Sequence, residues 1–488
     1  MSNEKIIKLP IIVCGKVYYA NDSDETVEIA YESGVKVVFP KLSEEHIRII
    51  KQQDKNLLHD LHFQDIICSL KKVGEFWSHS NSEHPLYREA ITNLCAINGY
   101  GTKMAEREMN IINQYCTLSN ALYDMLDAEL GSRFYLEEWL PREDGLVHAQ
   151  PQGKVLNVLV GNVPVTSILS LIRILLTKNC IISKLPKRDP ITALYFLLSF
   201  FEVIKDNPIL NALSICYWPG GDAVEETLLS FSDAVCVWGG GKAVKSIKSK
   251  AVNCAEIIEY GPKTSFSVVG KESANSKKVA IDLAHDISTY NQEACFSPQF
   301  VLVEGSTDVF IQNLREALEL YMKLLPKGNV YFDTHAQITR SRLEGLFNGN
   351  RVVSSNDGTD WTIVEIKDKN EINEHPLSRF IYVIRVDDIK ECIKFVDSNT
   401  QTITLSPWNR NVEIRDAATL RGACKITEIG LAESQRVGVP HDHMFPLHKL
   451  VKWVAVERGL DYLGKNIYDG PVDTTKWLMY DANMLEKI

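Results

Sequence analysis

The chain has 488 residues, more than a single domain usually holds, and this length predicts two or three domains. Its 53 lysines and arginines against 63 aspartates and glutamates give a formal net charge of −10. An acidic balance of this size repels nucleic-acid phosphates and anionic lipid surfaces, and no local basic patch offsets it. We therefore expect a small-molecule substrate, and neither nucleic-acid nor membrane binding.

The cysteine pattern and the N-terminal segment indicate the cellular compartment. The 11 cysteines are scattered from Cys14 to Cys424 and form no C-x-x-C pair, which fits neither a disulfide framework nor a zinc ribbon. Lys8 and Pro10 interrupt the apolar run at the N-terminus, which lacks the long hydrophobic region of a secretory signal. We expect a cytoplasmic protein.

The most apolar stretch, residues 155–176, approaches the length that a membrane span requires. Asn157, Asn162, Pro164 and Arg173 interrupt it. The segment is better explained as a buried strand (VLNVLV), a turn (GNVP) and an apolar helix (TSILSLIRILL). We expect no membrane span.

The remaining elements follow in chain order. Residues 43–128 have the mixed charged and apolar spacing of helices. After Pro141, β-branched runs alternate with amphipathic helices, which predicts a parallel sheet whose turns gather at its carboxyl edge; these runs include CIISKLP, LSICYWPGG, AVCVWGGG and SFSVVG. From about residue 271 a second αβ region contains EACFSPQFVLVEG, FIYVIRV and QTITLSPW. The tail, PLHKLVKWVAVERGLDYL and onward, predicts one more amphipathic helix.

Cys295 is the best candidate nucleophile. It lies between a predicted helix and an apolar strand, with Gln292 and Glu293 before it and Ser297 after it. A thiolate is a strong nucleophile, and its pKa falls near oriented backbone N–H groups or a positive charge. The alternative is a small buried apolar cysteine.

Two predicted turns offer further groups. Asn162 could donate its side-chain N–H to an oxyanion, or it could serve only as a turn residue that tolerates a left-handed backbone. The glycines at 239–241, followed by Lys242 and a helix, would let a phosphate approach a helix N-terminus. The alternative is an ordinary tight turn.

Two sets of titratable groups remain. Glu259 precedes the strand SFSVV and is either a general base across the pocket or a solvated carboxylate. His441, His443 and His448 lack the matching carboxylates or cysteines of a metal site, and packing or hydrogen bonding is the better explanation. We expect no metal.

The order of these elements is more specific than any one of them. Asn162, Lys184, the glycine turn at 239, Glu259 and Cys295 reproduce the motif order of the aldehyde dehydrogenase superfamily. KLPKRDPITAL resembles its segment K-P-x-E-x-x-P-x-T-A-L without gaps, and EYGPK resembles E-L-G-G-K.

Longer segments, spread from about residue 40 to about residue 460, resemble the acyl-CoA reductase (LuxC) family. They are ELGSRFYLEEWLP, GNVPVTSILSLIRILLTKNCIISK, AVCVWGGGKAV, AHDISTYNQEACFSPQ, PLSRFIYV, QTITLSPW and RVGVPHDHMFPLHKLV. The members of this family are the fatty-acid reductase subunits that make long-chain aldehyde for bacterial luciferase.

The resemblance implies an α/β, aldehyde dehydrogenase-like fold, with a Rossmann-type parallel-sheet cofactor domain and a second α/β catalytic domain. Residues 1–145 would form a largely helical lead-in, and residues 146–265 a Rossmann-like NADP(H)-binding domain. Residues 266–435 would form the catalytic domain with the nucleophilic cysteine. Residues 436–488 would return to the cofactor domain or form an oligomer contact.

The implied activity is NADPH-dependent reduction of long-chain fatty acyl-CoA, or of an acyl-protein, to fatty aldehyde through a thioester on Cys295. Asn162 and the Cys295 backbone N–H would hold the oxyanion. Lys184 would bind the adenosine ribose, Glu374 the nicotinamide ribose, and Gly239 and Gly240 would let the chain pass close to the cofactor.

The residue at one position predicts a preference for NADPH over NADH. Many NAD-selective members of the superfamily have a glutamate three residues after the ribose lysine, and this chain has Lys187 there, followed by Arg188. A carboxylate would bind a free 2′-hydroxyl and repel a 2′-phosphate, whereas these cations would attract the phosphate.

The sequence departs from the superfamily in two places: GNVP replaces P-W-N-x-P, and the loop after Glu374 lacks E-x-F-G-P. Both departures fit an acyl-CoA reductase better than an oxidising dehydrogenase. The role of Glu259 stays open, because a base that activates water would hydrolyse the acyl-enzyme; the alternative is proton relay with Cys295.

Three other functions remain open. They are a related reductase or dehydrogenase for another acyl group in a non-luminous pathway, a cysteine acyltransferase without hydride transfer, and an inactive scaffold for a partner synthetase. Family members work with an acyl-protein synthetase and an acyl-transferase, which implies these partners and a homo-oligomer.

Overall fold

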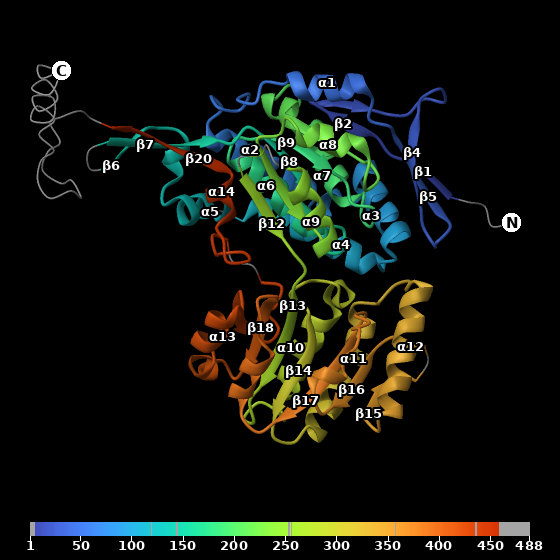
Figure 1. The fold of residues 1–488 in the computed structure, drawn as a ribbon. Coiled ribbons are helices and arrows are strands. Elements are labelled where there is room, and N and C mark those ends of the chain that lie inside the picture. Colours follow the sequence, from blue (N-terminus) through green and yellow to red (C-terminus); the bar gives the residue numbers. More distant parts are fainter. Residues whose placement is uncertain are drawn as a thin grey trace, which may run out of the picture.

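Two seven-stranded sheets organise the chain, one in each of two lobes. The structure, a computed structural model, describes residues 5–118, 120–142, 145–251, 254, 256–356, 358–434 and 437–457. In Figure 1 the first lobe lies above the second, and the chain crosses between them just before β13 and again after β19. The α/β class with parallel sheets is thus confirmed.

The first sheet has the order β12-β11-β8-β9-β10-β2-β3. Its strands are β2 (Ile11–Val13), β3 (Lys16–Tyr18), β8 (Lys154–Val158), β9 (Cys180–Lys184), β10 (Leu213–Cys216), β11 (Ala234–Trp238) and β12 (Glu256–Tyr260). The five strands from β12 to β10 are parallel, and β2 and β3 extend the edge in antiparallel fashion. The N-terminal region therefore supplies two strands of this sheet as well as helices.

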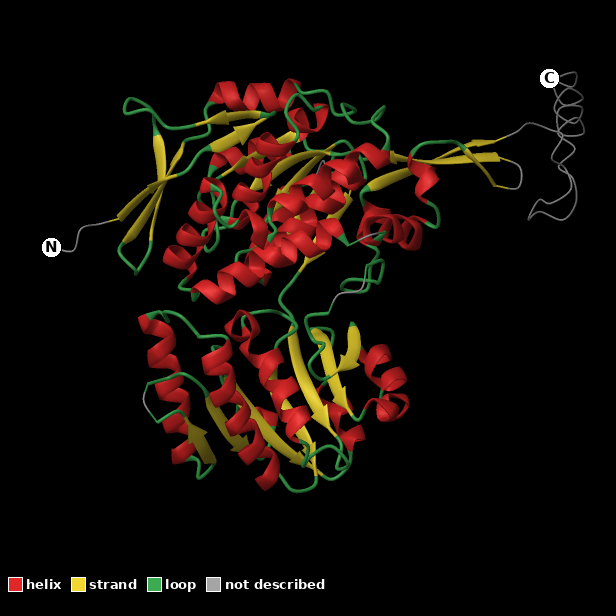
Figure 2. Cartoon of the chain, turned by 180° about the vertical axis from the view of Figure 1, so that it is seen from behind, coloured by secondary structure: helices red, strands yellow, loops and turns green. Residues whose placement is uncertain are grey.

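The helices α1 to α9 accompany this sheet in the described part of the first lobe. They are α1 (Glu44–Gln52), α2 (Phe63–Phe76), α3 (Pro85–Asn98), α4 (Thr102–Thr117), α5 (Ala121–Leu130), α6 (Pro164–Leu176), α7 (Thr192–Val203), α8 (Ala223–Leu229) and α9 (Gly241–Lys250). Figure 2 shows them packed around the strands. As the sequence predicts, residues 154–176 form strand, turn and helix, and α6 begins with Pro164 in its first turn, where a missing N–H costs nothing.

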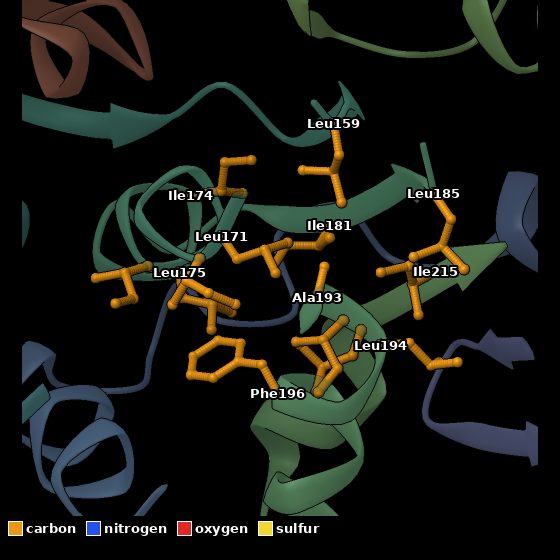
Figure 3. Close-up of a cluster of buried hydrophobic side chains, with 14 of the residues drawn as sticks. Leu159, Leu171, Ile174, Leu175, Ile181, Leu185, Ala193, Leu194, Phe196 and Ile215 are labelled. Carbon is orange, nitrogen blue, oxygen red and sulfur yellow. The ribbon is translucent and has the colours of Figure 1, made fainter. Parts of the chain in front are cut away.

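The core of the first lobe explains why α6 and α7 are apolar on nearly all sides. Both helices are buried almost throughout, because each lies between the sheet and other helices. Figure 3 shows one cluster of their side chains with those of β9 and β10 and of the loops that follow β8 and β9. The labelled members are Leu159, Leu171, Ile174, Leu175, Ile181, Leu185, Ala193, Leu194, Phe196 and Ile215.

The second sheet has the order β15-β16-β17-β14-β13-β18-β19 and is parallel except for β15. Its strands are β13 (Thr264–Val269), β14 (Pro298–Glu304), β15 (Arg351–Ser354), β16 (Thr362–Ile366), β17 (Phe380–Val386), β18 (Thr400–Ser406) and β19 (Lys425–Glu428). It is accompanied by α10 (Lys277–Ser288), α11 (Asp308–Leu324), α12 (Phe332–Phe347) and α13 (Arg415–Arg421). Neighbouring residues of β14 belong to different buried clusters, so both faces of the sheet are covered.

The strand SFSVV, which the sequence pattern groups with the strands before it, lies instead in the second sheet as β13, between β14 and β18. The expected boundary between residues 265 and 266 therefore falls inside this strand. No helix separates β12 from β13, because only residues 261–263 join these two strands. This segment is one of the crossings between the lobes.

Two small sheets flank the first lobe. One joins β1 (Lys5–Lys8), β5 (Val35–Pro40) and β4 (Thr26–Ala30). The other joins β20 (Val451–Glu457), β7 (Gly145–Pro151) and β6 (Leu140–Arg142), and extends away from the lobe in Figure 1.

The predicted helix of the tail is wrong for its described part. α14 (Pro446–Lys449) is a single turn, and the next seven residues form β20, which pairs with β7 along its whole length. The segment VKWVAVE is rich in β-branched and aromatic residues, and pairing with β7 decides its conformation. Residues 458–488 lie outside the described residues.

Among the described helices, none is both long enough and apolar enough to cross a bilayer. The apolar stretch that raised the question divides into β8 and α6.

Candidate active site

A pocket of about 380 Å³ opens where the carboxyl ends of β8, β11 and β12 meet the second lobe. The first lobe contributes the loops that follow these strands. The second lobe contributes the turn before β14, and the loop before α14 closes one side. The lining residues include Asn162, Arg188, Trp238, Gly239, Gly240, Tyr260, Lys263, Glu293, Cys295, Gln299, Leu377, His441 and Asp442.

Cys295 lies in this pocket, half-buried, three residues before β14. Its carbonyl accepts a hydrogen bond from the Ser265 hydroxyl at 2.6 Å, and that hydroxyl oxygen accepts one from the Thr402 backbone N–H at 2.9 Å. The cysteine also packs against an apolar cluster that includes Val163, Tyr290 and Phe296. Burial raises the pKa of the thiol to about 12, so it carries its proton at neutral pH.

The turn before Cys295 has an unusual backbone. Tyr290, Asn291 and Gln292 all have left-handed φ values, of 51°, 50° and 68°. A second left-handed run, residues 377–379 with φ of 55°, 58° and 62°, packs against it. Such residues cost free energy and persist only where the surroundings hold them.

Buried hydrogen bonds join the two runs. The Ser378 backbone N–H donates to the Asn291 carbonyl at 2.9 Å, and the Arg379 guanidinium donates to the Asn291 side-chain oxygen at 3.0 Å. Gln292 donates to the carbonyls of Pro298 and Phe380, both at 2.7 Å. The position of Cys295 is therefore fixed by contacts that are themselves buried.

Asn162 shares the pocket with Cys295. Its side-chain N–H donates to the Glu293 carbonyl at 2.8 Å, which ties the loop after β8 to the turn that carries the cysteine. On the other side of this loop, the Val165 backbone N–H donates to the buried Glu108 carboxyl at 2.5 Å. The Asn162 side-chain N–H, which would donate to an oxyanion, therefore lies on a loop that hydrogen bonds hold at both ends.

The two cations expected at the cofactor's 2′-phosphate separate in the structure. Lys187 is exposed, whereas Arg188 lines the pocket and forms an ion pair with Glu293, two residues before Cys295. Arg188 therefore lies at the cysteine end of the site.

Lys184 lies at the end of β9, outside the residues that line this pocket. Its ammonium contacts the Glu225 carboxylate at 2.7 Å and lies 5.2 Å from the centre of the Trp218 ring. Gly239 and Gly240 do line the pocket, and Gly240 precedes the first residue of α9. A Cβ atom added at Gly240 or Gly241 would meet no heavy atom within 4 Å, so the approach to the helix N-terminus is open.

The structure does not bring Glu259 or Glu374 among the residues that line the pocket. Glu259 is 47 % exposed and forms an ion pair with Lys248 of α9 at 3.0 Å. On β12 the neighbouring Tyr260 is buried and faces the pocket, and alternate residues of a strand point to opposite sides. Glu374 is exposed, although Leu377, three residues later, reaches the pocket.

Four further residues line the pocket, and the sequence analysis assigned none of them a catalytic or binding role. Trp238 and Tyr260, at the ends of adjacent parallel strands, stack with ring centres 3.5 Å apart, and His441 contacts both rings edge-on. Asp442 lies beside them. The only sequence signal for the last two was the H-x-H pattern, which we interpreted as packing.

Within the described part of the chain, no group of three His, Cys, Asp or Glu side chains could hold a metal ion. Burial lowers the pKa of His441 to about 3, so its ring is neutral.

The model of one protein family, acyl-CoA reductase (LuxC), matches residues 58–453. The chain belongs to this family. Among its curated relatives, the long-chain acyl-protein thioester reductase of Vibrio harveyi is 34% identical over 477 residues, which are 97% of this chain and 98% of the relative. That of Aliivibrio fischeri is 36% identical over 426 residues, 86% of this chain and 88% of the relative.

Solved structures of aldehyde dehydrogenases share the fold of this LuxC-family chain. Lactaldehyde dehydrogenase from Escherichia coli aligns with a TM-score of 0.70 and 15% identity, over 93% of this chain and 99% of that one. An NADP-dependent glyceraldehyde-3-phosphate dehydrogenase from Bacillus halodurans, complexed with NADP, aligns with a TM-score of 0.69 and 15% identity, over 92% and 99%. The aldehyde dehydrogenase-like fold expected from the motif order is confirmed.

Proposed function

We propose that this protein reduces long-chain fatty acyl thioesters, carried by coenzyme A or by a protein, to fatty aldehydes with NADPH. The observation that carries the proposal is the position of Cys295, which shares one pocket with Asn162 and with the open glycine turn before α9. The relatives' names, long-chain acyl-protein thioester reductase, support the substrate class. The apolar cluster beside Cys295 supports an apolar acyl group.

In the proposed reaction the Cys295 sulfur attacks the carbonyl carbon of the acyl thioester and the donor thiol leaves, so the acyl group is held on the cysteine. The Asn162 side-chain N–H, released from the Glu293 carbonyl, and the Cys295 backbone N–H would stabilise the oxyanion. Bound NADPH supplies the hydride that reduces this thioester. Collapse of the hemithioacetal then releases the aldehyde and restores the thiol.

The residues present fit a dinucleotide. The N-terminus of α9 has no side-chain cap, and the space over Gly240 and Gly241 is open, so backbone N–H groups can meet a pyrophosphate. Lys184 would bind the adenosine ribose, and its hydrogen bond to Glu225 would orient its ammonium. We propose that the exposed Lys187, rather than Arg188, attracts the 2′-phosphate and sets the preference for NADPH.

We also propose a cytoplasmic homo-oligomer that works with an acyl-protein synthetase and an acyl-transferase, and that supplies aldehyde to a luciferase. The cysteines of the chain, from Cys14 to Cys424, are all free thiols, which supports a reducing compartment. The small sheet of β6, β7 and β20 ends in exposed strand edges that a second copy could extend.

The test is reduced-nicotinamide consumption by the purified protein with tetradecanoyl-CoA, comparing NADPH with NADH. We expect NADPH oxidation with tetradecanal as the product, and its loss in Cys295→Ala. Cys68→Ala, which removes an exposed thiol, is the matched control and should keep the activity. Acylation of Cys295 without nicotinamide oxidation, also in the presence of the partner synthetase, would show an acyltransferase instead.

A further inference from the structure

A tight turn places Asp442 at the pocket. His441 and Met444 form a two-residue bridge, with backbone hydrogen bonds of 2.8 and 3.0 Å in the two directions. The two residues between them, Asp442 and His443, have φ values of 48° and 66°. Positive φ at both central positions is the geometry of a type I′ turn, which Asn-Gly normally occupies. Two residues other than glycine are strained there, and such strain gathers at functional sites.

The turn holds the Asp442 side chain inside the protein. This side chain is 8% exposed, lines the same pocket as Cys295, and accepts a hydrogen bond from the Gln401 amide at 3.2 Å. His441 packs on Trp238 and Tyr260, and its Nδ1 lies 3.7 Å from the Asp442 carboxylate; the His443 ring nitrogen lies 3.2 Å from the Cys424 sulfur. Of the two central residues of the turn, Asp442 is the one that lines the pocket.

Other carboxylates near the site are already engaged. Glu293 lines the pocket but is paired with Arg188, and Glu259 is on the surface with Lys248. Of the carboxyl groups that line the pocket in the described part of the chain, Asp442 is the one without an ion pair to a lysine or arginine. Burial raises the pKa of Glu293 as well, but Arg188 holds its carboxylate and opposes this rise, which makes it a poorer proton acceptor.

The electrostatics couple Asp442 to the thiol. The titratable and charged groups that act on the two are Lys263, Arg173, His441, His443, Cys424 and Lys425. Burial raises the pKa of Asp442, and the attraction of Lys263 opposes this rise. In turn, the negative charge of Asp442 adds to the effect of burial in raising the pKa of Cys295. A buried carboxylate that lines the same pocket as the thiol, and whose charge acts on the thiol, is a candidate to accept its proton.

We propose that Asp442 carries the proton for Cys295, in the place that the motif order assigned to Glu259. Its carboxylate takes the thiol proton as the sulfur attacks the acyl carbon, and gives that proton to the donor thiolate when the carbon–sulfur bond to the donor breaks. After hydride has reduced the acyl-enzyme, the hemithioacetal expels the Cys295 thiolate, and Asp442 passes it one proton from solvent. One thioester, one reduced nicotinamide and one proton thus give aldehyde, free thiol and oxidised nicotinamide. The inference rests on the proposed function.

The test compares Asp442→Asn with the wild type in two assays. Asparagine tolerates the left-handed backbone and can still accept from Gln401, so the turn is expected to survive. The single-turnover rate of Cys295 acylation by tetradecanoyl-CoA should fall by about 100-fold or more, as for loss of a general base. Alkylation of Cys295 by iodoacetamide should shift to lower pH, because a like charge has gone. A residue that only supports the fold would not make the thiol more acidic while slowing its acylation.

Two further variants serve as controls for this test. Asp442→Glu keeps the carboxyl group and should recover part of the acylation rate. Asp416→Asn removes a carboxylate that is 81% exposed on α13 and should change neither assay. Unchanged acylation in Asp442→Asn, or an alkylation profile that does not shift, would overturn the proposal. If the wild type forms no aldehyde but the alkylation profile of Asp442→Asn still shifts, the proposed function fails and the coupling of the two groups stands.

Discussion

The two walls of the pocket are built differently. On the wall from the first lobe, the space over Gly240 and Gly241 is open, and Lys187, which we expect to hold the 2′-phosphate, lies on the surface. On the wall from the second lobe, six left-handed residues in two runs are pinned by buried hydrogen bonds around Cys295. The first wall suits a ligand that binds and leaves in every turnover. The second is set in advance for covalent chemistry, where small displacements are costly.

The contrast is tested most strongly at Asn162, the point where the two walls touch. Asn162→Ala removes the side-chain donor from the oxyanion, and kcat should fall by about 10²- to 10³-fold. Steady-state kinetics with tetradecanoyl-CoA and NADPH measures this effect, and Asn56→Ala, at an exposed position, serves as the control. A normal kcat in Asn162→Ala would show that the oxyanion is held elsewhere.

The second wall is also tested through stability. The guanidinium of Arg379 is fully buried and donates to the Asn291 side chain and to the Leu325 carbonyl. Arg379→Met leaves both acceptors buried without a donor, so the free energy of unfolding should fall by about 2 kcal/mol. Urea unfolding measures the change, with the surface variant Arg415→Met for comparison. If Arg379→Met were as stable as the wild type, the left-handed runs would not depend on this residue.

A substitution in the first wall should change the cofactor specificity and leave the stability of the fold unchanged. Lys187→Glu places a carboxylate where we propose the 2′-phosphate binds, and the NADPH/NADH ratio of kcat/KM should fall at least about tenfold, or about 1.4 kcal/mol. Thermal unfolding should be unchanged, because Lys187 is exposed. Lys103→Glu, on the surface of α4, controls for a general change of charge. An unchanged ratio would move the preference for NADPH to another residue.

The smallest effect is expected at Glu259. Because its carboxylate is half-exposed and paired with Lys248 outside the pocket, Glu259→Gln should change kcat by less than about twofold. Its pH–rate profile should match that of the wild type. A fall in kcat of about 100-fold would show that Glu259 takes part in the reaction, and would remove the reason for assigning the proton to Asp442.

Local patterns predicted much of this molecule. The strand, turn and helix around Asn162 follow from a buried apolar run, a glycine and a proline, all within 25 residues, and the structure has them. The junction that carries Cys295 was visible because a helix pattern ends just before a strand pattern begins. The second sheet was also predicted, although β13 was grouped with the wrong one.

What the sequence could not predict depends on contacts between distant segments. The burial of Tyr260 against Trp238 decides on which side of β12 Glu259 lies. Arg188 lies near Cys295 because it pairs with Glu293, which is 105 residues away in the sequence. Asp442 lines the pocket of Cys295 only because the chain returns from the second lobe to the first after β19. The tail strand β20 likewise needs β7 as its partner.

The central claim is that Cys295 holds the acyl group before reduction, and the acyl-enzyme can be observed directly. The protein is mixed with tetradecanoyl-CoA without nicotinamide, and the peptide containing Cys295 is examined by mass spectrometry before and after NADPH is added. We predict a tetradecanoyl adduct on Cys295 that disappears with NADPH as tetradecanal appears. Aldehyde formation with no adduct on Cys295, or an adduct that NADPH discharges as fatty acid, would contradict the account.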